Sequence, residues 1–268
     1  MRGLALLALA ACSAQPEVPT TPRWVSLSPA ITDTIVALGA ADRLVAVSQH
    51  CSQPPGRELP RMGTLEALSA EALLRLKPSA VLTSTSRHAS IDGLRKAGIK
   101  TLQFPEGSLD EILGNPTRVG EALGLAEAGV KLSETLRQQM AALKSRDATL
   151  LKALLIFATE GRPLRQVWAA GPGGWLGELA ESVGLTNALT RGPSYAQLSI
   201  EGLIELAPEL LVVITASPDG NESMRADLAA LRALPGVKPE AVHALSGEAL
   251  LRPGPRLIEL AQGLAKLR

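Results

Sequence analysis

The sequence predicts an α/β protein of two halves joined by a long helix. Three observations predict this organisation. Short β-rich runs alternate with helical patterns in both halves of the 268-residue chain, a central stretch has helical spacing with no strand in it, and one motif of the first half recurs in the second. Strands that alternate with helices form βαβ units, which build mainly parallel sheets. Because an average domain has roughly 150 residues, each half is long enough for its own core.

The N-terminus predicts export. Arg2 precedes an apolar run that ends at Cys12 and is shorter than the roughly 18 residues of a membrane-spanning helix. We interpret residues 1–12 as a lipoprotein signal peptide, because Leu-Ala-Ala-Cys12 resembles a lipobox in which the cysteine receives the lipid. The alternative is an ordinary signal with an accidental cysteine. Residues 13–22 contain three prolines and one charge, which is typical of a tether. We therefore expect an extracytoplasmic protein that is anchored to a membrane by lipid on Cys12.

Residues 23–117 are predicted as an N-terminal α/β lobe. Ser28 and Pro29 suit the N-cap and the first turn of a helix that Gly39 ends, and Ser69 caps the next helix. The expected strands cover 24–27, 44–47, 80–83 and 100–104, and the expected helices cover 31–38, 70–76 and 91–97.

Residues 118–148 are predicted as the linker helix. Four apolar residues recur at helical spacing between about 126 and 145, and twenty helical residues would span about 30 Å. Residues 149–268 are predicted as a C-terminal α/β lobe. Its expected β-rich runs cover 151–157, 166–169 and 210–214, and its expected helices cover 176–183, 200–206, 224–231 and 256–267.

An internal repeat relates the two lobes. Leu68–Pro78 recurs 130 residues later as Leu198–Pro208, with six identities in eleven positions. Each copy places a serine at the N-cap and a glutamate, Glu71 or Glu201, in the first helical turn. A carboxylate there interacts with the positive end of the helix dipole for a few tenths to about 1 kcal/mol, which is the purely structural interpretation. The repeat indicates that the two halves share a fold.

Composition and motifs argue against several classes of function. The 27 basic and 26 acidic groups leave a net charge of +1, which gives no electrostatic surface for nucleic acid. The sequence has no P-loop, no G-x-S-x-G and no CxxC or HExxH metal motif, and the glycines of Gly171–Gly177 are only loosely spaced. We therefore expect no enzyme, no cofactor and no dedicated metal site. As an alternative, His50 or Cys51 reaches the metal of a bound chelate.

Several features together resemble one family. The string Arg23–Gly39, the Gln53-Pro-Pro55 after a strand, both Leu-Ser-x-Glu repeats and Leu251–Arg256 resemble the iron-chelate and vitamin B12 (cobalamin) class of periplasmic binding proteins, over residues 23–268. The resemblance implies two Rossmann-like lobes joined by a single long α-helix, the class III arrangement, with a large metal chelate in the cleft between them. It implies a monomer that delivers this ligand to the permease dimer of an ABC importer with its ATPase. In that family one glutamate per lobe docks on permease arginines, and Glu71 and Glu201 match these positions.

The resemblance also implies where the ligand binds. Trp168 and Tyr195 match aromatic residues that cobalamin-binding relatives place against the corrin, and Glu248 and Arg252 match a polar pair near the ligand. In open α/β sheets such sites are lined by loops at the carboxyl ends of strands, and we expect Ser194-Tyr195 to be one of these loops. In the first lobe, the aromatic positions of the family fall here on residues of other types. The expected ligand-binding residues are Gln53, Leu65, Ser84, Trp168, Trp175, Tyr195, Glu248 and Arg252.

Three hypotheses follow. In the first, the protein is a lipid-anchored substrate-binding protein for a cobalamin-like or another large metal chelate. In the second, the same binding module takes haem or a ferric siderophore. In the third, it is a ligand sensor or scavenger lipoprotein that works without a permease, so that Glu71 and Glu201 have no docking role.

Overall fold

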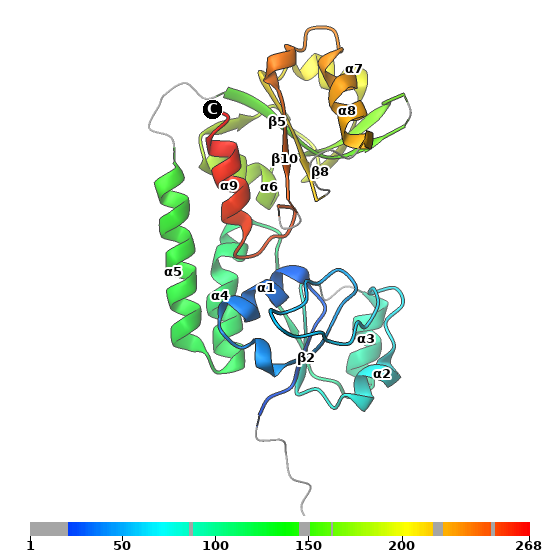
Figure 1. Cartoon of the computed structure of the whole chain (residues 1–268), viewed down its shortest axis with the longest axis vertical. Coiled ribbons are helices and arrows are strands. Elements are labelled where there is room, and N and C mark those ends of the chain that lie inside the picture. Colours follow the sequence, from blue (N-terminus) through cyan, green and yellow to red (C-terminus); the bar gives the residue numbers. More distant parts are fainter. Residues whose placement is uncertain (1–20, 86–87, 145–150, 162, 217–221, 248–249) are drawn as a thin grey trace, which may run out of the picture.

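The computed structural model describes residues 21–85, 88–144, 151–161, 163–216, 222–247 and 250–268. These residues form two α/β lobes, one above the other, with helices along one side (Figure 1). The predicted signal peptide, Cys12 and most of the predicted tether lie outside the described residues. Within the described ranges, no helix is both long enough and apolar enough to cross a membrane.

A four-stranded parallel sheet forms the centre of the N-terminal lobe, in the order β2-β1-β3-β4. Helix α1 covers one face, and α2 with α3 covers the other, so the strands are apolar on both sides. α1 begins where predicted, because the hydroxyl of Ser28 accepts from the N–H of Ile31 at 3.4 Å and Pro29 follows it. The predicted strands and helices of this lobe are confirmed. The elements are β1 Trp24–Ser26, α1 Pro29–Ala37, a 3-10 turn at Ala41–Arg43, β2 Leu44–Val47, α2 Ala70–Arg75, β3 Ala80–Thr83, α3 Ala89–Lys96 and β4 Thr101–Gln103.

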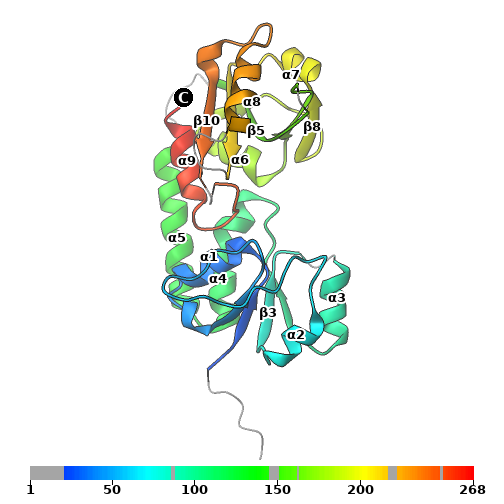
Figure 2. The same ribbon diagram turned by 45° about the vertical axis from the view of Figure 1, so that its right-hand side comes forward.

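A helical hairpin links the lobes: α4 (Leu109–Leu123) and α5 (Ala126–Leu143) lie side by side in both views (Figures 1 and 2). α5 is the expected long helix. The predicted range 118–148 nevertheless starts inside α4, which ends at Gly124 in the left-handed conformation with φ 72°. At the closest approach of the two helices, a Cβ on Gly129 would lie 2.5 Å from the carbonyl oxygen of Pro116. Only a residue without a side chain permits this contact.

A six-stranded sheet forms the centre of the C-terminal lobe, in the order β10-β9-β5-β6-β8 with β7 beside β5. β6 pairs antiparallel with both neighbours, while the other pairs are parallel. The expected runs 151–157, 166–169 and 210–214 are strands. Tyr195, expected in a loop, is instead the first residue of a strand. The elements are β5 Leu151–Glu160, β6 Gln166–Ala170, α6 Trp175–Ser182, β7 Leu185–Asn187, β8 Tyr195–Ser199, α7 Ile200–Leu206, β9 Leu210–Thr215, α8 Glu222–Arg232, a 3-10 turn at Pro239–Ala241, β10 Val242–Ser246 and α9 Leu257–Ala265.

Helix α4 belongs to the hydrophobic cores of both lobes. Ile112 and Leu113, near its start, are buried with α6 and α9 in the C-terminal lobe. Val119 and Leu123, near its end, are buried with α1 and the sheet of the N-terminal lobe. Leu132 of α5 packs against both cores. The lobes are therefore fixed to each other by shared packing along the hairpin as well as by the continuity of the chain.

Candidate functional site

The carboxyl ends of β1 and β10 point to the region where the lobes meet (Figure 1). After β10 the chain crosses to the other lobe, where Arg252 donates to the hydroxyl of Ser52 and lies 3.9 Å from Asp33 Oδ2 on α1. The Arg252 and Asp33 side chains are only 12% and 11% exposed. Arg252, expected near the ligand, is thus engaged in a contact between the lobes. Its role toward a ligand stays a prediction.

Phe157, Trp175 and Tyr195 form an aromatic corner in the C-terminal lobe. Tyr195 is 48% exposed. The buried indole N–H of Trp175 donates to the Tyr195 hydroxyl at 3.0 Å, and the Phe157 ring meets the Tyr195 ring edge-on with centroids 5.5 Å apart. Partial burial raises the pKa of Tyr195, the hydrogen bond from Trp175 opposes this, and the charge of Glu106 raises the pKa further. The hydrogen bond from Trp175 therefore helps to fix the position of the Tyr195 ring.

Trp168 lies on the same face of the sheet as Tyr195, two residues along the pairing of β6 with β8. Register pairs Trp168 with Gln197 and Ala170 with Tyr195, so these side chains share a face. The indole N–H of Trp168 donates to Glu160 Oε1 at 2.6 Å, and Gln197 donates to Glu160 Oε2 at 3.1 Å. Trp168 is half-buried, and its role toward a ligand stays a prediction.

Sequence reasoning missed Glu106, which follows β4 in the segment leading to α4. The hydroxyl of Ser28 donates to Glu106 Oε1 at 2.9 Å, and Ser84 forms a second side-chain hydrogen bond to it. Burial raises the pKa of Glu106 from 4.5 to about 7, although both serines act to lower it. Its charge acts on Tyr195 of the other lobe, so Glu106 lies where the lobes meet. The only sequence signal was an acid directly after a strand.

Each lobe has a pocket at the carboxyl ends of its strands. The N-terminal pocket has about 200 Å³ and lies beside Leu65, one of the expected ligand residues. His50 is at its rim, and Glu66 lies 4.0 Å from Nε2 of His88. A hydrogen bond from Thr64 is the main cause of a lowered pKa of Glu66, and the two histidines contribute. The lining residues are Leu27, Pro29, Ser48, His50, Thr64, Leu65 and Glu66.

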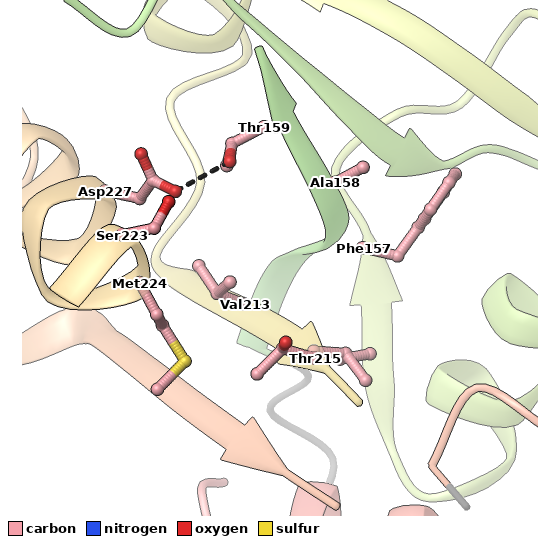
Figure 3. Close-up of a pocket in the computed structure, with 9 residues that line it drawn as sticks. Phe157, Ala158, Thr159, Val213, Thr215, Ser223, Met224 and Asp227 are labelled. Carbon is pink, nitrogen blue, oxygen red and sulfur yellow. Dashed lines mark hydrogen bonds between the residues drawn. The ribbon is translucent and has the colours of Figure 1, made fainter. Parts of the chain in front are cut away.

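The C-terminal pocket lies between β5, β9 and α8 and has about 160 Å³ (Figure 3). Figure 3 shows the hydrogen bond from Thr159 of β5 to Asp227 of α8 at the upper end of the pocket. Val213 and Met224 lie lower down. No sequence motif marks this position. The lining residues are Phe157, Ala158, Thr159, Val213, Ile214, Thr215, Ser223, Met224 and Asp227.

The remaining predicted site residues have varied surroundings. Gln53 is half-buried, and its side chain forms two hydrogen bonds with the backbone of Leu59. These bonds stabilise the loop between the two residues. Glu248 lies outside the described residues. Cys51 is buried, with its sulfur 3.0 Å from the hydroxyl of Ser48. Among the described residues, no cluster of three or more metal-ligating side chains is arranged to hold a metal ion.

The two glutamates of the repeat occupy matching places. Ser69 and Ser199 cap α2 and α7 as predicted, accepting from backbone N–H groups at 3.2 and 3.1 Å. Glu71 and Glu201 are exposed in the first turns of these helices. Glu71 forms an ion pair with Arg75 at 2.6 Å. In both views α2 and α7 lie on the side of the molecule away from α5 (Figures 1 and 2).

Two α/β lobes held by shared helices, with pockets at the strand ends of each lobe, define a two-lobed solute-binding protein. The family model described as periplasmic binding protein matches residues 25–247, and the chain belongs to this family. The predicted family and fold class are thereby confirmed. The relatives that the chain resembles are named as binding proteins, and one of them is named as an ABC transporter substrate-binding lipoprotein.

Three relatives illustrate the similarity. The vitamin B12-binding protein of Vibrio cholerae is 26% identical over 244 residues, covering 90% of this chain and 86% of its own. YvrC of Bacillus subtilis, named an uncharacterized ABC transporter substrate-binding lipoprotein, is 25% identical over 250 residues, covering 90% and 78%. The crystal structure of the periplasmic haem-binding protein HutB of Vibrio cholerae has a TM-score of 0.79 at 28% identity, covering 92% of this chain and 99% of that one.

Proposed function

We propose that this protein is the substrate-binding component of an ABC importer and holds a large metal chelate of the corrinoid type between its lobes. The aromatic corner carries this proposal. Tyr195 exposes about half of its surface while Phe157 and Trp175 fix its ring, and a held aromatic ring offers an apolar face to a flat macrocycle. The relatives named for vitamin B12 and haem support the same class of ligand.

Shared packing of α4 suits this role. Since the same helix contributes to both cores, the lobes are pre-arranged and ligand binding spends little free energy on closing them. The contact of Arg252 with Ser52 adds a second connection between the lobes. The ligand therefore meets two lobes that are already held in place relative to each other.

Titration calorimetry of the purified protein with cyanocobalamin, haemin and a ferric siderophore tests the ligand class. We expect saturable binding of cyanocobalamin, tighter than that of the other two, and weaker binding by Tyr195→Ala. Ser182→Ala, on α6 and away from the aromatic corner, is the control and should bind as the wild type does. Failure of all three ligands to bind would contradict the proposal.

Glu71 and Glu201 are proposed as the contacts to the permease. Both are exposed, one on each lobe, and the helices that carry them, α2 and α7, lie on the same side of the molecule. Two separated acidic contacts set orientation and encounter rate more than affinity, which suits a carrier that has to dissociate. The ion pair of Glu71 with Arg75 is solvent-exposed and contributes little, so it leaves Glu71 available.

An uptake assay tests this docking role. The double variant Glu71→Ala, Glu201→Ala should lose uptake of the bound chelate and keep solution affinity. The matched control is Glu127→Ala, Glu134→Ala, which removes two exposed acids from α5 and should support uptake. Unchanged uptake in the first double variant would favour the sensor or scavenger hypothesis.

Anchoring by lipid on Cys12 is also proposed, with an extracytoplasmic location that follows from the family. Cys12→Ser should move the protein from the membrane fraction to the soluble extracytoplasmic fraction. Retention of the Cys12→Ser protein in the membrane fraction would contradict the anchor.

Haem is the second candidate ligand. HutB, whose fold this chain shares, is named as a haem-binding protein, and His50 lies at the rim of the N-terminal pocket with an imidazole that is able to coordinate haem iron. A Soret band that appears on titration with haemin and shifts in His50→Ala would support this candidate. Binding of cyanocobalamin with no haemin spectrum would rule it out.

A further inference from the structure

A pocket lined by Arg23, Arg43 and Arg57, here called the basic pocket, lies at the end of the N-terminal lobe that is remote from the other lobe. The described chain begins at this end in both views, just before β1 (Figures 1 and 2). Because β1 and β2 are parallel, their amino ends lie at the same edge of the sheet. Thr21 and Pro22 also line the basic pocket, which has a volume of about 330 Å³. The pocket therefore lies beside the segment that leads back to the N-terminus.

The three guanidinium groups of the basic pocket have uncharged partners. Nε and Nη2 of Arg23 donate to the carbonyl oxygen of Leu76 at 3.2 and 3.0 Å. Nη1 of Arg57 donates to the carbonyl oxygen of Ala41. Arg43 lies over the indole ring of β1, with its Cζ 5.3 Å from the ring centroid. Each guanidinium has more N–H groups than these contacts use, so all three are able to bind a further acceptor.

The basic pocket carries a net positive charge. Asp42 is the acidic residue among those that line it. Among the described residues, no carboxylate forms an ion pair with any of the three arginines. Lys100 adds a cation in an adjoining hollow that shares Pro22 with the pocket. The whole chain has a net charge of only +1, so positive charge is concentrated at this end of the lobe. Guanidinium groups bind phosphate oxygens in pairs, which makes a phosphate the matching ligand.

We propose that the basic pocket binds the phosphate of an anionic phospholipid in the membrane to which Cys12 is anchored. Thr21 follows Cys12 by nine positions, which span at most about 30 Å, so lipid on Cys12 keeps the pocket near the headgroups. An anionic leaflet attracts cations that lie within a Debye length of its surface. The location at the membrane rests on the proposed lipid anchor, whereas the charge of the pocket does not.

Contact at this end of the lobe leaves the opposite end accessible. The four strands of the N-terminal sheet are parallel, so their carboxyl ends point away from the basic pocket. The N-terminal pocket beside Leu65 lies at those carboxyl ends. A protein that rests on the membrane through its basic pocket therefore keeps the N-terminal pocket open to a ligand.

Vesicle binding tests the proposal in the full chain with Cys12→Ser, which removes the site of the proposed lipid. Affinity is measured for vesicles of phosphatidylcholine alone and of phosphatidylcholine mixed with phosphatidylglycerol. The apolar N-terminus is common to every variant, so the ratio of the two affinities reports the effect of lipid charge. This ratio should favour the mixed vesicles and should fall as the salt concentration rises. Equal affinity for the two kinds of vesicle would overturn the proposal.

Charge variants locate the contact. Arg43→Gln with Arg57→Gln should lower the ratio about 30-fold, because each cation near an anionic surface contributes about five-fold. Arg165→Gln with Arg225→Gln removes two exposed arginines from the C-terminal lobe and is the matched control, which should keep the ratio. Asp42→Asn removes the acid of the basic pocket and should raise the ratio about five-fold. An equal loss in both double variants would overturn the assignment to this pocket.

Two further measurements keep the test decisive. A thermal melt shows whether Arg43→Gln folds without its contact to the indole ring; if it does not, Arg57→Gln and Asp42→Asn decide. A melting temperature that inorganic phosphate raises, in a protein that binds both kinds of vesicle equally, would identify a site for soluble phosphate and overturn the lipid assignment.

Failure of the anchor is distinguishable from failure of the basic pocket. Salt screens the attraction of the pocket to lipid, so fractionation of Cys12→Ser after a high-salt wash reports on the anchor alone. If that protein stays in the membrane fraction, the proposed anchor fails. The ratio of vesicle affinities still decides whether the basic pocket binds anionic lipid.

Discussion

Glu106 makes the stability of this protein depend on pH in a direction that is unusual for an acid. Its pKa is about 7 in the folded protein against 4.5 in the unfolded chain, because burial opposes its charge. Between these pH values the folded state holds a proton that the unfolded state has released, so the free energy of unfolding falls as the pH rises. Over 2.5 pH units at about 1.4 kcal/mol each, the loss amounts to about 3 kcal/mol.

Glu106→Gln removes this titration and keeps an oxygen that accepts from Ser28 and Ser84. The variant should match the wild type near pH 4.5 and be more stable by about 3 kcal/mol at pH 8. Urea titrations at pH 4.5, 5.5, 6.5 and 8 measure the difference. Glu121→Gln, an exposed acid on α4, is the control and should show no such trend. A Glu106→Gln effect that is constant across this range would refute a buried, proton-holding Glu106.

Substitutions at Gly129, Tyr195 and Arg252, with Gly93 as a control, test the framework and the site. Gly129→Ala should lower the free energy of unfolding by about 1–3 kcal/mol in urea, because its methyl group meets Pro116 at 2.5 Å; equal stability would contradict the close helix contact. Gly93→Ala, with open space in α3, should instead raise it by about 1 kcal/mol. Tyr195→Phe should bind cyanocobalamin nearly as well as the wild type and Tyr195→Ala about ten-fold less tightly, by calorimetry; equal affinities would contradict the stacking role. Arg252→Ala should lower Tm, because it removes the contact with Ser52 between the lobes; an unchanged Tm would contradict a stabilising contact.

Local signals in the sequence predicted most of the elements. Ser28, Ser69 and Ser199 cap helices as expected, because a cap depends on neighbours within a few residues. β8 was missed because Tyr195 is ordered by pairing with β6, a contact between distant segments. The start of the hairpin was missed for a different reason. Pro116 argues against a helix, yet α4 continues through it, and the hydroxyl of Ser133 on α5 accepts from the N–H of Thr117 at 3.2 Å.

The candidate site was less predictable than the fold. The resemblance predicts that Tyr195 contacts the ligand; the ring is 48% exposed, and its role toward a ligand stays a prediction. Glu106 and the pocket of Asp227 were missed because each depends on side chains far apart in the chain. Ser28 and Glu106 are separated by 78 residues, and Thr159 and Asp227 by 68. No spacing rule connects such pairs, since only the folded sheet brings them together.

The packing of helix α4 in the cores of both lobes has a consequence for ligand release. A binding protein whose lobes keep one arrangement has a single affinity, the same when it takes up its ligand and when it releases it. The more tightly it binds a scarce ligand, the more free energy is needed to release that ligand. Release of the ligand, and not its binding, is then the step that needs an external source of energy.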